Sequence, residues 1–230
     1  MSVPTWRALL LVYRRIELPG GFSHTLDDGE VAVALDSFRR FPGLAADLSA
    51  GAVAVTCEVV DAGRPLTSLT PMGEGIRWPS PDDTRPELDR LAPPGARDSV
   101  FALWPQRDSA TGAQVPTGGW GLAIRATEWS NGATYATVAN AAPAVWARPV
   151  AGEVWLHEWL HGVCDHFARL GFEMPPFDAD GGGPAGYEQS PSDGWCPYYR
   201  DLMTGRVRVG DRPLGIPPQA WRTGSIIERS

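Results

Sequence analysis

Residues 154–161 read Val-Trp-Leu-His-Glu-Trp-Leu-His, and this stretch decides the fold. The surrounding apolar residues recur at helical spacing from Gly152 to Leu170, which predicts a helix ended by Gly171. His157 and His161 are four residues apart, so both imidazoles lie on one face and can reach one cation at about 2.0–2.1 Å. Glu158 is able to reach a water on that cation without binding the cation itself.

Upstream of this helix, short apolar runs bounded by Gly and Pro predict β-strands. An Asn131-Gly132 pair between two β-prone runs predicts a hairpin turn. A helical pattern opens at Asp27-Asp28 and is expected to break or kink at Pro42-Gly43, before a last turn at 44–48. The predicted strands cover residues 8–16, 52–60, 99–104 and 120–125, and the hairpin signal lies within 126–138.

Downstream of Gly171 the chain alternates between loops and short helices. A loop rich in Gly and Pro covers 174–194 and resembles the earlier stretch 61–98, which holds one short helix near 86–91. A further helix is predicted to start near Pro197, since Pro is favoured at the first helical position. The expected fold class is therefore α+β, with a mixed and mostly N-terminal sheet, a backing helix, the His-bearing helix and a loop-rich helical C-terminal part.

The motif His157-Glu158-x-x-His161 and the order of elements over about residues 99–205 resemble the zincin metallopeptidases. The resemblance implies a zincin-like domain over 1–230, with an N-terminal lobe over 1–170 and a small C-terminal lobe over 171–230. It also implies a Zn²⁺-dependent endopeptidase acting on a peptide or protein substrate. In that family an edge strand holds the extended peptide, and residues 120–125 or the hairpin after them would serve here.

The third zinc ligand is less strongly indicated than the first two. Residues 190–199 resemble, loosely, the later motif of the aspzincins, which makes Asp193 the favoured ligand and Tyr198 or Tyr199 the donor that stabilises the transition state. The motif departs from the family pattern because the Tyr lies five or six residues beyond the Asp and the flanking Gly-Thr is absent. Asp193 is alternatively the N-cap of the helix near Pro197.

Four other residues remain candidates for that ligand. His166 lies five residues after His161, and at 100° per residue it points away from the face of the first two ligands. Asp178 and Asp180 precede three glycines in a loop that resembles the start of a calcium site. Glu188 lies in a loop-like stretch, and Asp165 is a candidate for orienting a ligating His.

Composition excludes some classes of function. The formal net charge is −7, and all 20 basic residues are Arg scattered along the chain, so a nucleic-acid partner is not expected. No apolar run approaches the roughly 18 residues that a membrane span needs. Residues 8–13 form a short apolar segment that precedes Arg14-Arg15, and this order favours a buried strand over a signal peptide. The compartment stays open between the cytoplasm and secretion of a trimmed form.

Three cysteines do not form a disulfide framework, although Cys164 and Cys196 are able to pair if their segments meet.

A different class of function also remains open. The ten Trp residues are compatible with a zincin-like binding module that grips a protein or glycan partner and holds a structural zinc. A metal closed by four protein ligands would favour that module, whereas an open position facing a cleft would favour the enzyme. Oligomeric state and substrate specificity are not predicted.

Overall fold

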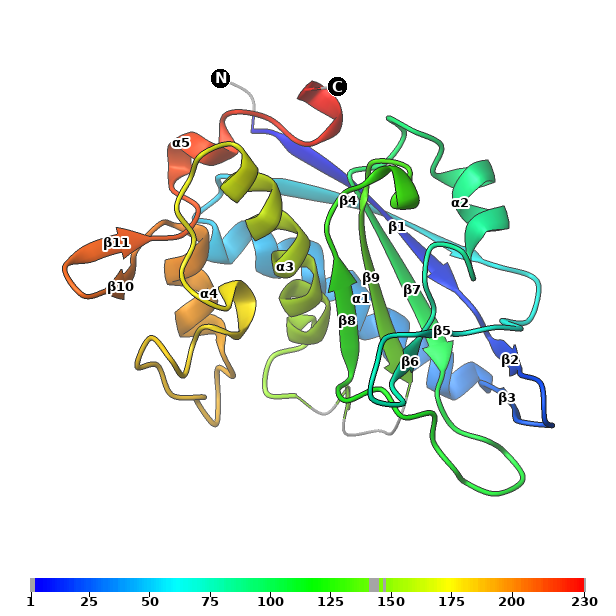
Figure 1. Cartoon of the computed structure of the whole chain (residues 1–230). Helices are drawn as coiled ribbons and strands as arrows, with labels where there is room; N and C mark the ends of the chain where they lie inside the picture. Colours follow the sequence, from blue (N-terminus) through cyan, green and yellow to red (C-terminus); the bar gives the residue numbers. More distant parts are fainter. Residues whose placement is uncertain (1–2, 141–144, 147, 230) are drawn as a thin grey trace.

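The computed structural model describes residues 3–140, 145–146 and 148–229. Its centre is a five-stranded sheet in the order β4-β1-β7-β9-β8 (Figure 1). Four neighbouring strands are parallel, and β8 runs antiparallel to β9 at one edge. The strands are β1 (Thr5–Val12), β4 (Ala54–Asp61), β7 (Ser99–Pro105), β8 (Gly121–Ile124) and β9 (Thr134–Asn140). The prediction of an α+β chain with a mixed sheet is confirmed.

The inner strands are apolar runs because both faces of the sheet are covered. Every residue of β7 and β9 is buried, and β1 carries the continuous run Leu9-Leu10-Leu11. The parallel register places Leu10 beside Phe101, and Phe101 beside Ala136. Continuous apolar runs of this kind are expected for parallel strands that lie between two layers.

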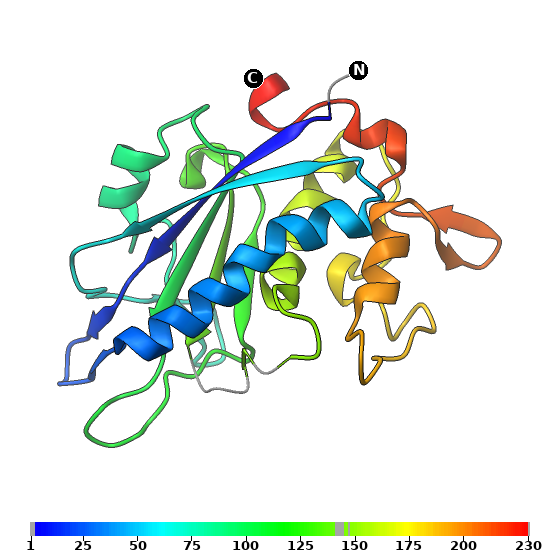
Figure 2. The ribbon, with the colours of Figure 1, turned by 180° about the vertical axis from the view of Figure 1, so that it is seen from behind.

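Two long helices, α1 (Asp28–Leu48) and α3 (Glu153–Arg169), pack on one face of the sheet, and Figure 2 shows α1 crossing it. Asp27 and Glu30 begin α1 with a capping box. Of the break or kink predicted at Pro42, the break is wrong, because Pro42 lies inside a continuous helix. Buried Phe41, Ala45 and Leu48 carry the apolar face of the helix past Pro42, and this packing offsets the local cost of the proline.

The opposite face is covered by the stretch rich in Gly and Pro. Its elements are β5 (Thr70–Pro71), β6 (Arg77–Trp78) and α2 (Arg85–Leu91), and its buried Leu66, Trp78 and Leu88 pack against the sheet. A small ribbon of β2 (Arg15–Glu17) and β3 (Ser23–Thr25) extends from the end of β1. The core therefore lies on both sides of the sheet.

The predicted hairpin forms between β8 and β9, but its connection is longer than the Asn131-Gly132 pair. Residues 126–130 are not a strand, because Glu128–Ser130 form the 3₁₀ turn η1 and Asn131 follows in the left-handed region at φ 55°. The antiparallel pair still forms, with Ile124 beside Tyr135. Asn131-Gly132 is therefore the end of a helical turn within a longer hairpin loop.

The C-terminal segments pack onto α1 and α3. They are η3 (Asp178–Asp180), α4 (Cys196–Met203), β10 (Val207–Val209), β11 (Arg212–Leu214), α5 (Pro218–Trp221) and η4 (Ile227–Arg229). Tyr198, Leu202 and Trp221 belong to the same buried cluster as Trp6 and Phe38. Cys57, Cys164 and Cys196 are all free thiols. No helix in the described parts of the chain is long and apolar enough to cross a lipid bilayer.

Candidate metal centre

Helix α3 presents His157 and His161 side by side, at the edge of the sheet where β8 lies. Their Nε2 atoms are 3.3 Å apart, with the two rings nearly perpendicular. This is the arrangement that the spacing of four residues predicts. Gly162 brings α3 close to the sheet, since a Cβ at that position would lie 2.6 Å from Thr134 on β9.

A third donor group comes from the turn η3, which packs against both α3 and α4. Asp180 Oδ1 lies 3.4 Å from His157 Nε2, and Asp180 Oδ2 lies 3.8 Å from His161 Nε2. One ligand atom from each of the three residues falls within 4.8 Å of the others. Of the described residues, His157, His161 and Asp180 thus form a group able to hold a metal ion.

The other nitrogen of each imidazole is also occupied by a polar partner. His157 Nδ1 lies 2.8 Å from the hydroxyl of Tyr199 on α4, and His161 Nδ1 is hydrogen-bonded to the carboxylate of Asp178. Such partners fix the orientation and tautomer of a ligating imidazole. Asp165, the residue predicted for this role, instead forms an ion pair with Arg169 at 2.7 Å.

Burial and neighbouring charges shift the pKa values of the residues in this group. Burial, reinforced by the charges of His161 and Arg148, lowers the pKa of His157 to about 3, so its ring is neutral. Burial also lowers the pKa of His161, but the Asp178 carboxylate outweighs it and the net shift is upward. Burial raises the pKa of Glu158 to about 7, against the opposing effect of His161.

The side chain of Glu158 extends from α3 to the edge strand β8. This side chain is buried, and a Cβ on Gly121 of β8 would lie 2.0 Å from Glu158 Oε1. Only glycine at position 121 therefore allows the strand and the carboxylate to come this close. Gly121 was not among the residues predicted for the site, although a glycine inside a β-prone run is a known sign of close backbone approach.

Glycines also place the turn that carries Asp178 and Asp180. A Cβ on Gly181 would lie 2.5 Å from the Tyr198 hydroxyl, and one on Gly182 would lie 2.7 Å from the ring of Trp195. The turn can therefore pack directly on α4. The run of three glycines after Asp180 is the signal in the sequence that this loop approaches other groups closely.

The structure does not bring the other predicted residues to the histidine pair. Asp193 is exposed, and its carboxylate accepts hydrogen bonds from Ser192 Oγ at 2.6 Å and Ser190 Oγ at 3.1 Å. It is not the side-chain cap of α4, whose N-cap is Trp195. Glu188 is exposed in the loop, and the ring of His166 packs edge-on against Trp6, with centroids 5.6 Å apart.

Tyr198 and Tyr199 make contacts beside the histidine pair that the sequence did not predict. Tyr198 is fully buried, and its hydroxyl donates to the backbone carbonyl of Asp178. Tyr199 contacts His157 as described above. Both tyrosines thus support the residues of the metal-binding group from α4, and sequence spacing alone did not distinguish this role from a catalytic one.

The metal-binding group opens onto a cleft of about 970 Å³. One side of this cleft is polar and includes His157, Glu158, His161, Asp178 and Asp180. The other side is formed by β8 and by apolar residues near it, among them Met72, Ile76, Trp78, Trp120 and Trp129. The arrangement combines a group able to hold a metal ion, an adjacent carboxylate and the edge strand β8 within one cleft.

No protein-family model matches the chain. No curated protein matches it either. The solved structure of metalloproteinase-II from Bacteroides fragilis is similar at a TM-score of 0.37 and 12% sequence identity. The similarity covers 70% of this chain and 42% of that one, so this chain spans less than half of that protein's length.

Proposed function

We propose that this chain is a zinc-dependent metallopeptidase, in which His157, His161 and Asp180 hold the ion and Glu158 is the general base. The observation that carries the proposal is the convergence of the two Nε2 atoms, 3.3 Å apart, beside a buried carboxylate and a free strand edge. Asp180 replaces Asp193 as the third ligand in this proposal because its carboxylate lies beside both imidazoles.

The donor set fits a zinc ion. A tetrahedral ion with bonds of about 2.0–2.1 Å separates its ligand atoms by about 3.3–3.4 Å. The two Nε2 atoms are 3.3 Å apart and Asp180 Oδ1 lies 3.4 Å from His157 Nε2, both within this range, while the other carboxylate oxygen, Oδ2, lies 3.8 Å from His161 Nε2. If each ring donates its Nδ1 proton, to Tyr199 and to Asp178, both Nε2 lone pairs face each other. Two lone pairs this close repel each other unless a proton or a metal ion lies between them.

The three protein ligands leave a position for a water or a substrate carbonyl, as in catalytic rather than structural zinc sites. Zinc, when bound, supplies a Lewis acid that lowers the pKa of a water and polarises a peptide carbonyl. Glu158 follows His157 on the helix, and in the proposed mechanism its carboxylate would accept a proton from that water and deliver it to the leaving amine.

The edge strand β8 supplies a way to hold an extended peptide next to these groups. Ala139 N–H donates to the Trp120 carbonyl on the neighbouring strand. In antiparallel pairing the hydrogen-bonding direction alternates, so the backbone groups of Gly121 and Ala123 point away from β9 to the free edge. A substrate strand pairing there would present its backbone beside Glu158 with little dependence on sequence.

The test combines metal content with peptide cleavage. We expect about one zinc per chain by elemental analysis, and cleavage of unstructured peptides that stops after chelation and returns with zinc. Glu158→Gln should abolish cleavage while zinc stays bound. Glu188→Gln, which changes an exposed acid outside the cleft, is the matched control and should leave both unchanged. A metal-free preparation that still cleaves would overturn the proposal. A zinc-loaded protein that binds peptides without cleaving them would instead favour a binding module.

A further inference from the structure

The cleft has a second, apolar side that the chemistry of peptide hydrolysis does not use. Met72, Ile76, Trp78 and Trp129 line it, and we name these four residues the apolar ledge. Trp78 is buried and forms its base, whereas Met72 and Trp129 remain 38% and 37% exposed. Large apolar side chains left exposed inside a cleft are typical of a binding surface.

The ledge is joined to the far face of β8. Leu122 and Ile124 pack with Ile76 against the core that lies opposite α3, whereas Ala123 packs on the α3 side. Side chains of a strand alternate between the two faces of a sheet. A peptide added to the free edge of β8 would therefore point every second side chain toward α3 and the others toward the ledge.

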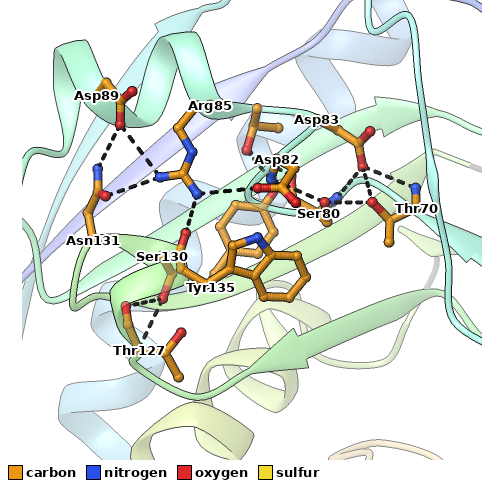
Figure 3. A network of polar contacts seen from close by, with 12 residues as sticks. Thr70, Ser80, Asp82, Asp83, Arg85, Asp89, Thr127, Ser130, Asn131 and Tyr135 are labelled. Carbon is orange, nitrogen blue, oxygen red and sulfur yellow. Dashed lines mark hydrogen bonds and ion pairs between the residues drawn. The ribbon is translucent and has the colours of Figure 1, made fainter.

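Hydrogen bonds hold the ledge in place (Figure 3). Asp83 Oδ2 accepts from Ser80 N at 2.7 Å, from Thr70 Oγ1 at 2.9 Å and from Thr70 N at 3.1 Å, which closes the base of the β5–β6 hairpin that carries Met72 and Ile76. Arg85 donates to the backbone carbonyl of Trp129 and, at 3.1 Å, to Asn131 Oδ1. The ledge is therefore formed before any ligand binds, and little ordering is needed on binding.

We infer that the substrates are extended peptides with bulky apolar side chains at alternate positions, and that the apolar ledge selects them. The inference rests on the proposed peptidase function, because the ledge and the catalytic groups share one cleft and one strand edge. Apolar side chains that face the ledge exchange water for contact with Met72, Ile76 and Trp129. Side chains on the other face of the peptide point toward α3, where the ledge exerts no selection.

The test uses three peptides of equal length and charge. In the first, Leu occupies every second position; in the second, Ser replaces each Leu; in the third, the same Leu residues are grouped together. Affinity is measured by fluorescence anisotropy on zinc-loaded Glu158→Gln protein, and kcat/KM is measured on the unmodified chain. We expect the alternating-Leu peptide to bind about tenfold more tightly than the Ser peptide, equivalent to about 1.4 kcal/mol. The grouped-Leu peptide should fall between them.

Substitutions in the ledge decide whether it is the cause of this preference. In a Met72→Ser, Trp129→Ser double variant the preference should fall to about twofold or less, with unchanged affinity for the Ser peptide. The matched control is Val209→Ser, which alters an equally exposed apolar residue on β10, and it should keep the full preference. If circular dichroism shows that the double variant does not fold, the same preference is measured on Met72→Ser alone, because that side chain is partly exposed.

The outcomes separate this inference from the proposed function. Cleavage without any preference for alternating Leu, or a preference that survives the double substitution, overturns the ledge as the selecting surface and leaves the peptidase proposal intact. Absence of cleavage by the zinc-loaded chain overturns the peptidase proposal, whereas the binding data still report on the ledge.

Discussion

His157 Nε2 lies 3.3 Å from His161 Nε2, while the Nδ1 atoms of the same rings are bound by Tyr199 and Asp178. Each imidazole is thus held at its far side and directed at a common point. The supports come from α4 and from the turn η3, two segments that follow α3 in the chain. This relationship makes the effect of single substitutions around the pair predictable.

Replacing Asp180, the proposed third ligand, should weaken metal binding selectively. Asp180→Ala removes the carboxylate that lies beside both Nε2 atoms, so we expect zinc affinity to fall by more than about tenfold, or about 1.4 kcal/mol. Asp193→Ala removes a carboxylate bound only within its own turn and should leave affinity unchanged within about twofold. Competition with a chelator measures both values. Equal losses in the two variants would contradict Asp180 as the ligand.

The partner of His161 should matter almost as much as a ligand. Asp178→Asn keeps the shape of the side chain but removes the charge that orients the ring, and we expect zinc affinity to fall by about 10–100-fold. Asp165→Asn on the same helix is the control, because Asp165 pairs with Arg169 at the surface. A similar zinc affinity in Asp178→Asn and the unmodified chain would show that this hydrogen bond does not support the site.

Gly121 should be intolerant of even one methyl group. A Cβ there would lie 2.0 Å from Glu158 Oε1, so Gly121→Ala must displace either the carboxylate or the strand. We expect a loss of kcat of about 100-fold or more, since general-base catalysis contributes about 10²–10⁴-fold, with zinc content unchanged. The comparison is Gly119→Ala, where the nearest atom to a new Cβ is 3.7 Å away. Full activity in Gly121→Ala would contradict the close approach.

Weakening the anchor of the β5–β6 hairpin should affect binding rather than chemistry. Asp83 Oδ2 accepts three hydrogen bonds at the base of that hairpin, and Asp83→Ala leaves those donors without their partner. We expect faster hydrogen exchange over residues 70–80 and a higher KM for the alternating-Leu peptide, with kcat changed less than about twofold. Asp82→Ala, at the neighbouring exposed position, tests whether loss of any nearby acid has this effect. A fall in kcat at constant KM would argue against the hairpin as a binding element.

Acid should destabilise the fold through Glu87. Burial raises the pKa of this carboxyl, but hydrogen bonds from Arg64 and Tyr13 outweigh burial and leave the pKa below its ordinary value. A group with a depressed folded-state pKa stabilises the fold above its unfolded-state pKa, about 4.3 for Glu, and loses that contribution as the pH falls through the folded-state pKa.

The variant Glu87→Gln tests this pH dependence. It should lower the free energy of unfolding by about 1–3 kcal/mol at pH 7, because Arg64 loses a charged partner. Between about pH 5 and pH 3 it should then lose less stability than the unmodified chain, since it has no proton to take up at this position. Urea unfolding at several pH values measures both effects. Parallel pH curves for the two proteins would exclude Glu87 as the titrating group.

The parts of the fold that sequence predicted well are those with a strong local pattern. The apolar runs of β1 and β4 and the helical spacing around His157 each indicate one type of element, and the structure confirms all three. The break predicted at Pro42 and the strand predicted directly before Asn131-Gly132 do not form, because their local signals are overridden. Buried Phe41 and Ala45 carry α1 through the proline, and the 3₁₀ turn before Asn131 uses the left-handed residue as its end.

The residues of the candidate site also differ in how well the sequence predicts them. His157, Glu158 and His161 belong to one helix, so their relation follows from helical geometry alone. Asp180 reaches them across a loop, and no periodic pattern reports where a loop folds back. Asp193 had a better resemblance to a known motif, but its side chain is held by Ser190 and Ser192. The close packing of Gly181 and Gly182 on α4 decides where Asp180 lies, and this packing is a tertiary contact.

The placement of α4 has a consequence for the newly made chain. Helix α4 spans Cys196–Met203 and supplies both Tyr199, which holds His157, and the surface on which the turn of Asp180 rests. A ribosome-bound chain that has emerged only through α3 carries the two histidines and Glu158, but neither the turn nor its support. On the proposed function, proteolytic activity therefore cannot begin until α4 has been made and has packed beside α3.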